Sequence, residues 1–200
     1  MSEIAKILSD IKEFYFKEAP YYKKLTFKPF TLKNIESFEK KIGFNLGEEL
    51  KEFLMVCDFR LDFNGAFSYE DKNTVLMNWK VSDDLIKSKT FEGWKERMIK
   101  NGFNNWKEEL IGPFYCSNKW IPIACDGCGN LICIDYDPGK NGVIGQVINM
   151  EFQDGQGPYF CETTLVKYLK KQYQYLINGK WTKWEYGEEG NELIEIDGYM

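Results

Sequence analysis

Cysteines gather in the middle of the chain, where Cys125 and Cys128 form a CxxC pair and Cys116 and Cys133 flank it. A zinc site made of four thiolates normally uses two such closely spaced pairs, and only one is present. Cys133 also falls within an apolar run, where a cysteine usually packs as a small core residue. A redox role requires a helix directly after the pair, whereas a strand is predicted here. The sequence therefore predicts no cofactor, with zinc as the open alternative.

Carboxylates lie around the same segment, at Asp126, Asp135 and Asp137. Two carboxylates in different environments can perform acid–base catalysis, but acidic residues in turns more often accept hydrogen bonds from the backbone. The stretch that starts at Asp135 is similar to the start of a calcium loop. Lys140, however, stands in place of the required glycine, and Gln146 stands in place of the bidentate glutamate. Neither carboxylate catalysis nor calcium binding is favoured.

Histidine is absent from the 200 residues. This absence excludes Ser-His-Asp and Cys-His catalysis, histidine general bases and every metal site that contains histidine. We therefore predict that the protein is not an enzyme. The alternative is a carboxylate enzyme, whose turnover would be lost in Asp126→Asn or Asp135→Asn variants that still fold.

Acidic residues are concentrated at the C-terminal end of the chain. The formal net charge is −5, and the acids from residue 185 onward, with no base among them, are Glu185, Glu188, Glu189, Glu192, Glu195 and Asp197. The remainder is nearly neutral, so no overall field attracts nucleic acid. An acidic segment can instead attract a basic protein partner, and the alternative is a solvated, frayed tail.

Several strands are predicted to position these residues. Trp120–Asp135 is predicted to form two buried strands around a glycine-rich turn, because apolar and β-branched residues flank Asp126–Asn130. A strand over 143–150 extends this hairpin to an antiparallel meander. Alternating residues over 181–196 predict a terminal hairpin, and Val75–Met77 is a further candidate strand.

Apolar residues at helical spacing predict helices, and capping residues mark their ends. The predicted helices cover residues 2–17, 32–42, 47–57, 85–100 and 164–178. Together with the strands they predict an α+β fold, in which a central antiparallel sheet around the Trp120–Met150 strands is packed by the N-terminal and C-terminal helices. No break in composition marks a boundary, so residues 1–200 are predicted to form a single domain.

The location of the protein is predicted from what the sequence lacks. The first ten residues do not have the basic and apolar regions of a secretion signal, and apolar runs such as Phe53–Cys57 are too short to cross a bilayer. We therefore predict a cytoplasmic protein that keeps its cysteines reduced and has no membrane partner.

The order of motifs along the chain resembles that of the SUKH superfamily, in its branch of cell-wall assembly regulators. The matching segments are Ile35–Gly43, Leu46, Leu50–Leu54, Asn64–Gly65, Trp120–Ala124, Asp126–Asn130, Ile132–Asp135, Pro138–Gly139, Gly145–Ile148 and Thr164–Leu169. The hairpin motif is the most specific of them. The resemblance covers about residues 30–175 and leaves the N-terminal helix and the acidic tail outside as elaborations.

The resemblance implies an α+β fold and a binding role without a shared catalytic triad. Bacterial members are chiefly immunity proteins, each of which neutralises the C-terminal domain of a polymorphic or contact-dependent toxin, often a nuclease. It thus implies an antitoxin whose partner is a cognate protein toxin domain, as a monomer or weak dimer that binds no nucleic acid. The alternative is an intracellular scaffold or regulator without a toxin partner.

The residues expected to contact the partner are acids that imitate a phosphate backbone, together with an aromatic anchor. They are Asp126, Asp135 and Asp137 at the ends of the hairpin, and Trp184, Glu185, Glu188 and Glu189 in the C-terminal segment. For the C-terminal aromatics, the alternative is ordinary packing against the last helix.

Overall fold

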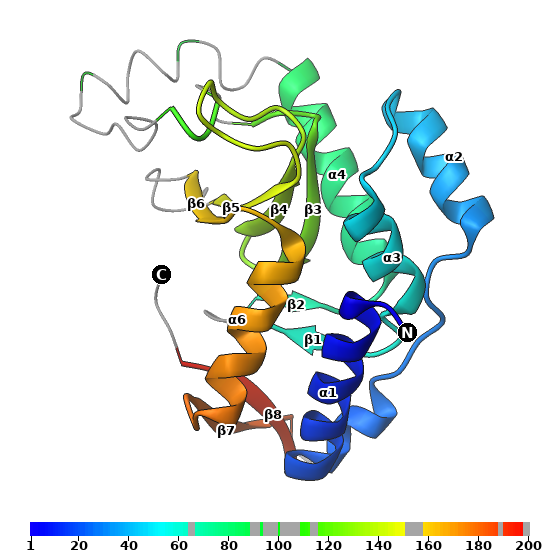
Figure 1. Ribbon diagram of the computed structural model, residues 1–200, viewed down its shortest axis with the longest axis vertical. Helices are drawn as coiled ribbons and strands as arrows, with labels where there is room; N and C mark the ends of the chain where they lie inside the picture. Colours follow the sequence, from blue (N-terminus) through cyan, green and yellow to red (C-terminus); the bar gives the residue numbers. More distant parts are fainter. Residues whose placement is uncertain are drawn as a thin grey trace. The chain divides into compact units, whose positions relative to one another are not determined.

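The chain forms two compact units in the computed structural model (Figure 1). Unit 1 combines Met1–Lys72 with Val166–Met200, and unit 2 comprises Asn73–Leu165. The structure describes residues 1–63, 67–88, 93, 100, 109–112, 116–150, 158–187 and 190–197. Each unit is therefore built from its own helices and strands, and unit 1 joins the two ends of the sequence.

Helices form most of unit 1. They are α1 (Glu3–Glu18), the short 3₁₀ helix η1 (Pro20–Lys24), α2 (Leu32–Ile42), α3 (Glu48–Val56) and α6 (Leu165–Ile177). Thr31 caps α2 through a reciprocal pair of hydrogen bonds with Asn34, and Gly43 ends it at a φ of 84°. The Glu49 carboxylate of α3 accepts a hydrogen bond of 3.2 Å from the backbone N–H of Val166 at the start of α6. The helices predicted in these segments are confirmed.

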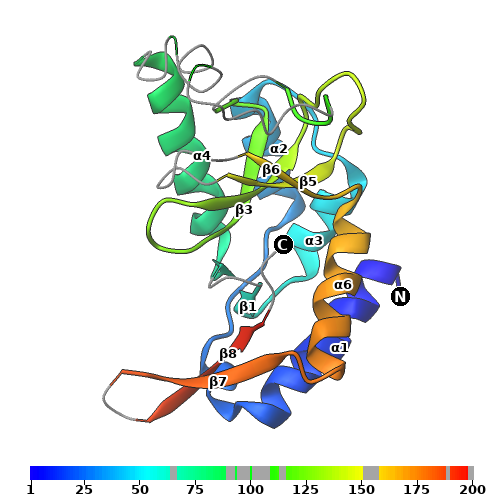
Figure 2. The same cartoon turned by 90° about the vertical axis from the view of Figure 1, so that its left-hand side faces the viewer.

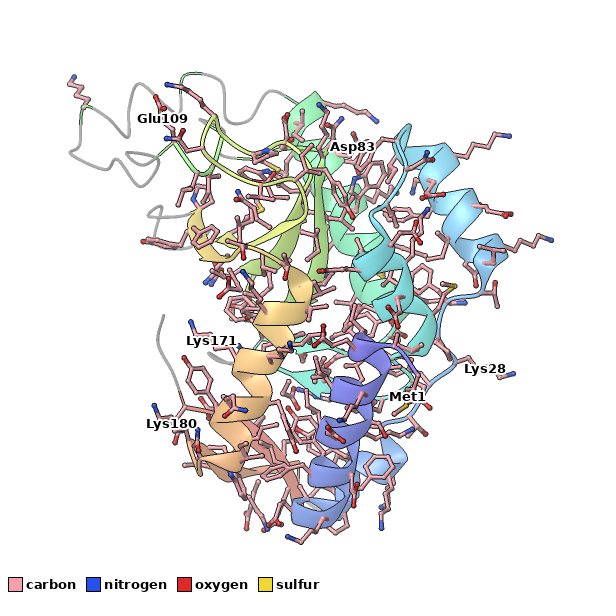
Figure 3. All side chains as sticks on the ribbon, in the orientation of Figure 1. Met1, Lys28, Asp83, Glu109, Lys171 and Lys180 are labelled. Carbon is pink, nitrogen blue, oxygen red and sulfur yellow. The ribbon has the colours of Figure 1, made fainter. Side chains whose placement is uncertain are left out.

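The outer surface of α6 is basic, as its spacing predicts. Lys171 on the helix and Lys180 just after it point away from the ribbon (Figure 3). The opposite side of the helix is buried through Tyr168, Leu169 and Leu176. The amphipathic pattern therefore fixes which side of α6 faces the core of unit 1.

Two antiparallel pairs of strands complete unit 1. Strand β1 (Leu61–Asp62) pairs with β2 (Ser68–Tyr69), and β7 (Trp181–Tyr186) pairs with β8 (Asn191–Ile196). Strands β1 and β8 lie side by side (Figure 2). The predicted terminal hairpin is confirmed, while the Asn64–Gly65 turn lies outside the described residues.

Aromatic side chains form much of the core of unit 1. The ring of Tyr15 on α1 lies 4.5 Å from that of Tyr22 and 6.2 Å from that of Phe59. Phe63, just after β1, stacks on Tyr168 of α6 with ring centroids 5.6 Å apart. All five side chains are at most 1% exposed. These contacts bring together the N-terminal helix, the β1 region and the C-terminal helix, so both ends of the chain share one core.

Unit 2 contains an antiparallel meander of β3 (Trp120–Cys125), β4 (Leu131–Asp135), β5 (Gln146–Met150) and β6 (Tyr159–Glu162). Every residue of β4 and β5 is buried, so both faces of these strands are covered. The predicted α+β fold with an antiparallel meander is confirmed.

The ends of the meander differ from the prediction in two places. β5 begins three residues later than predicted, because 143–145 form a turn in which Gly145 has a φ of 89°. β6 was not predicted, since only Cys161 of its four residues is fully buried and the segment lacks a clear apolar alternation.

Helix α4 (Lys72–Lys87) corrects two predictions. Val75–Met77 is helical and not a strand, and residues 85–87 end this helix, whereas a helix was predicted to begin at residue 85. The short apolar run favoured a strand, but Val75, Trp79 and Ser82 are buried at helical spacing. The Trp79 indole donates a hydrogen bond of 2.9 Å to the carbonyl oxygen of Asn118, which fixes α4 beside the start of β3.

Helix α4 ends in an ion pair between Asp83, which Figure 3 labels, and Lys87 one turn later. The rest of the predicted helix to residue 100 lies outside the described residues, apart from Gly93 and Lys100. Among the helices that the structure describes, none has the length and apolar character that crossing a membrane would require.

Candidate partner-binding site

Asp126 holds the turn between β3 and β4. One of its carboxylate oxygens accepts hydrogen bonds from the backbone N–H groups of Cys128, at 2.8 Å, and Asn130, at 3.0 Å. The other accepts a bond of 2.7 Å from the Asn130 side chain. Gly127 and Gly129, with φ of 77° and 109°, provide the left-handed backbone that this turn needs. Asp126 is therefore half-buried and bonded within its own turn.

Asp135 is completely buried at the end of β4, so the prediction that it is exposed for a partner is wrong. Its carboxylate accepts hydrogen bonds from the Gln146 amide, at 2.8 Å, and from the backbone N–H of Asp137, at 2.7 Å. Burial raises the pKa of Asp135 from 3.8 to about 6, against the hydrogen bonds from Asp137 and Gln146, which lower it. Sequence spacing could not show that both faces of the strand are covered.

Asp137, which follows β4, is half-exposed and forms an ion pair. Its carboxylate lies 3.3 Å from the ammonium of Lys119 and accepts a hydrogen bond of 3.3 Å from the Ser117 hydroxyl. Its side chain is 32% exposed. The hairpin thus contains one half-exposed acid in an ion pair, one acid bonded within a turn and one sealed in the sheet, which together do not form a single acidic surface.

The cysteines of the CxxC region differ in burial. Cys133 is buried, Cys116 and Cys125 are half-buried, and Cys128 is exposed. Burial raises the pKa of Cys116 to about 11, so it stays a thiol at neutral pH. Within the described part of the chain, no group of three or more Cys, Asp or Glu residues is arranged to hold a metal ion.

Two hollows lie in unit 1, and Arg60 lines both. The larger has a volume of about 330 Å³, and its walls include Tyr21, Phe27, Arg60, Glu70, Asp71 and Leu193. The smaller has a volume of about 220 Å³ and is lined by Arg60, Asp62, Phe63, Trp184, Ile194 and Glu195. Both combine apolar side chains with carboxylates, which is the composition expected of a contact surface for a basic and partly apolar partner.

A hydrogen-bond network centred on Asp62 holds the wall between the hollows. The Arg60 guanidinium donates to the Asp62 carboxylate, at 2.9 Å, and to that of Glu70, at 2.8 Å. The Tyr22 hydroxyl donates to Asp62 and accepts a bond of 3.0 Å from the backbone N–H of Ile194. The network therefore ties η1, β1 and β8 together through side chains distant in the sequence.

The buried position of Asp62 affects its titration. Burial raises the pKa of the Asp62 carboxyl above its usual value, although the charge of Arg60 and the hydrogen bonds from Tyr22 and Arg60 act to lower it. Burial likewise raises the pKa of the Tyr22 hydroxyl, so it remains a hydrogen-bond donor. This buried network is an ordered scaffold for the exposed residues around it.

The predicted contact residues of the C-terminal segment differ in whether they line a hollow. Trp184 is 42% exposed and lines the smaller hollow. Glu185 is exposed but does not line it, and Glu188 and Glu189 lie outside the described residues. Trp181 is half-buried and packs edge-on against Phe14 of α1, with ring centroids 5.2 Å apart.

Sequence reasoning missed Arg60, Asp62 and Tyr22. A signal was available, because Arg60 is one of only two arginines in the chain and stands between Phe59 and Leu61 with an acid two residues later. That spacing puts the guanidinium and the Asp62 carboxylate on the same side of an extended segment. The role of Tyr22, 40 residues away from Asp62, has no such local signal.

The described helices and antiparallel strands define an α+β protein with a central hairpin. The chain belongs to the SMI1/KNR4 family (SUKH-1), whose model matches residues 29–171. This range agrees with the resemblance over about residues 30–175. The predicted superfamily and branch are confirmed.

Three proteins that the chain is similar to are fungal. A glucan synthesis regulatory protein of Neurospora crassa is 23% identical over 194 residues, covering 82% of this chain and 36% of that protein. A cell wall biosynthesis/cell cycle regulator, smi1, of Schizosaccharomyces pombe is 23% identical over 180 residues, covering 84% of this chain and 34% of that protein. KNR4/SMI1 homolog 2 of Debaryomyces hansenii is 40% identical over 57 residues, which cover 26% of this chain and 10% of that protein. The chain thus spans about a third or less of the length of these relatives.

Proposed function

We propose that the chain is a protein-binding module that acts by forming a stoichiometric complex, and that its partner is the toxin domain of a bacterial polymorphic or contact-dependent toxin. Binding would cover the active site or the substrate surface of that domain. The observation that carries this proposal is the pair of hollows in unit 1, in which an exposed tryptophan stands among carboxylates.

The composition of these hollows supports recognition of a basic protein. Trp184 supplies the large aromatic surface that often dominates binding energy at interfaces. The exposed Glu195 presents negative charge in the same hollow, and Glu70, whose side chain is 57% exposed, does so in the larger one. A nuclease domain carries positive charge in order to bind a phosphate backbone, and carboxylates can compete for that surface.

The fungal relatives favour a second candidate function. Proteins named as regulators of glucan synthesis and of cell wall biosynthesis match more than four fifths of this chain. As a regulator, the chain would bind one or more endogenous proteins and would have no toxic partner. Both candidates use a binding surface, and they differ in the identity of the partner.

A growth assay with co-purification distinguishes these functions. The C-terminal domain of the protein encoded immediately upstream is expressed with and without this chain. We expect toxicity that the chain relieves, together with a one-to-one complex on size-exclusion chromatography. A harmless neighbour would favour the regulator, and rescue without a complex would contradict neutralisation by binding.

A matched pair of variants locates the contact. Trp184→Ala removes the aromatic anchor and should weaken both rescue and complex formation. Leu32→Ala is the control, because Leu32 is a 61% exposed apolar residue on α2 that lines neither hollow. Equal effects of the two variants would contradict a contact centred on the hollows.

A further inference from the structure

We propose that the smaller hollow of unit 1 is a seat for one basic side chain, an arginine or lysine, of the bound protein. This inference rests on the proposed function in one respect, that the natural occupant belongs to a protein partner. It adds the chemistry that the site recognises and the residues that determine it: Trp184, Glu195 and Asp62.

The size of the hollow suits a single side chain. Its volume is about 220 Å³, below the roughly 300–1,000 Å³ of pockets that hold drug-sized molecules. Phe63 and Ile194 contribute apolar surface to its lining. An alkyl stem that ends in a cation combines an apolar body with a charged tip, and it matches a site that has both kinds of lining.

The register of the β7–β8 hairpin places the aromatic and the acid together. Trp184 pairs with Leu193, and Thr182 pairs with Glu195. Trp184 and Glu195 are therefore diagonal neighbours on the same face, and such residues lie about 7–8 Å apart in an antiparallel pair. A cation between them would contact the ring face of the tryptophan and the carboxylate at the same time.

Glu195 is available for such a contact. It is exposed, and its carboxylate forms no ion pair with any residue in the described part of the chain. The neighbouring hairpin acid Glu192 differs, since it lies 3.3 Å from the ammonium of Lys183. Glu195 is thus a charge that an incoming cation can neutralise without displacing a described internal partner.

Arg60 does not convert the hollow into an anion site. Its guanidinium already donates to two carboxylates, those of Asp62 and Glu70, at 2.9 and 2.8 Å. Its side chain is only 17% exposed. The lining of the hollow contains one base, Arg60, and two acids, Asp62 and Glu195. An entering anion would therefore meet an excess of negative charge, whereas an entering cation would be attracted.

The Tyr22–Asp62 network keeps this seat in place before anything binds. Tyr22 bonds both to the Asp62 carboxylate and to the backbone N–H of Ile194, the residue before Glu195. Because β1 and β8 are linked in this way, little ordering of the binding site is required on binding. The exposed tryptophan and the free carboxylate provide the recognition, and the buried network provides the geometry.

The test follows the tryptophan indole resonances of the full-length chain by ¹⁵N NMR while n-butylguanidinium is added. The Trp184 resonance, identified with a Trp184→Phe variant, should shift saturably, while the other five indoles serve as internal controls. Neutral n-butylurea, which has nearly the same shape, should bind at least about tenfold more weakly, because an ion pair and a cation–π contact are lost.

Two carboxylate variants show whether Glu195 determines the binding. Glu195→Gln should weaken n-butylguanidinium binding severalfold. Glu185→Gln, which removes an equally exposed charge from the opposite face of the same strand pair, should leave it unchanged. A correctly folded Glu195→Gln chain that binds as tightly as the natural sequence would overturn the proposal.

The remaining outcomes also decide the proposal. Equal binding of the neutral and cationic probes, or no shift of the Trp184 resonance by the cation, would overturn it. Either result could occur while the growth assay still shows rescue and a complex, so the seat can fail although the module binds a protein. The reverse result, cation binding without any toxin complex, would support the seat and contradict neutralisation of a toxin.

Discussion

The carboxylates of the β3–β4 hairpin and those around Arg60 perform different tasks, although their residue types are the same. In unit 2, Asp126 and Asp135 direct their oxygens to backbone and amide groups of the same meander. In unit 1, Asp62 joins Arg60 and Tyr22, while Glu195 remains unpaired with any described residue at the edge of a hollow. The first set maintains a turn and a strand end, and the second forms a potential contact surface.

The difference shows that acidity in a loop motif is poor evidence for binding. A glycine-rich turn leaves several backbone N–H groups without partners, and an aspartate at its start is well placed to accept from them. Carboxylates reach a partner only when their surroundings leave them exposed. Variants that change stability without binding, or binding without stability, therefore test whether the two sets of carboxylates have these separate roles.

The largest loss of stability is expected from Asp62→Ala. Arg60 would lose one of its two carboxylates, and the Tyr22 hydroxyl would lose its acceptor in the core. We expect the free energy of unfolding to fall by about 3 kcal/mol, as measured by urea denaturation. Asp58→Ala is the control, since its ion pair with Lys12 is 41% exposed on the aspartate side and should contribute below about 1 kcal/mol. Similar losses would contradict the central role of Asp62.

The second-largest effect on stability is the pH dependence that we expect from Asp135. Its pKa is raised in the folded state, from 3.8 to about 6, so the folded chain binds its proton more tightly than the unfolded chain. The contribution of Asp135 to stability therefore falls as pH rises through this window, by on the order of 2 kcal/mol.

The measurement for Asp135 compares unfolding free energies of the natural chain and Asp135→Asn between pH 4 and 7. The difference between the two should decrease as pH rises, because asparagine does not titrate. The pH profile of the natural chain alone would not isolate Asp135, because the raised pKa of Asp62 also lowers stability as pH rises. The difference between the two chains removes that contribution. Parallel profiles would contradict the buried, charged environment assigned to Asp135.

A smaller loss of stability is expected from Asp126→Ala, which removes three hydrogen bonds within the turn. We expect about 1–2 kcal/mol in urea denaturation, with unchanged partner binding. Asp126→Asn keeps an oxygen acceptor for the backbone N–H groups and should lose less. Weaker partner binding in a stable Asp126→Asn chain would show that the hairpin is part of the interface after all.

The smallest effect on stability is expected from Glu195→Gln. Because the residue is exposed and its carboxylate forms no ion pair with a described residue, the free energy of unfolding should change by less than about 0.5 kcal/mol. Association with the partner should slow, and the difference from the natural chain should shrink as salt is added. Stopped-flow measurements at two salt concentrations check this, and a salt-independent difference would contradict a role in electrostatic attraction.

Local signals in the sequence predicted most of the described elements. Thr31 and Gly43 mark the ends of α2 because capping and positive φ are properties of single residues. The glycine-rich turn and its flanking β-branched residues similarly predicted β3 and β4. Where local signals conflict, prediction failed: Val75–Met77 favours a strand by composition, yet packing of Trp79 and Ser82 on one side makes it helical.

Residue types and their order were thus enough to predict the family, the α+β class, the lack of histidine chemistry and the acidic C-terminal segment. Only the tertiary structure decided which acids are exposed, because burial depends on elements far apart in the chain. Asp135 is sealed by its neighbours in the sheet, whereas Glu195 borders a hollow built from β1 and the terminal hairpin. Tyr22 reaches Asp62 across 40 residues and Ile194 across 172, and no local pattern encodes contacts at such separations.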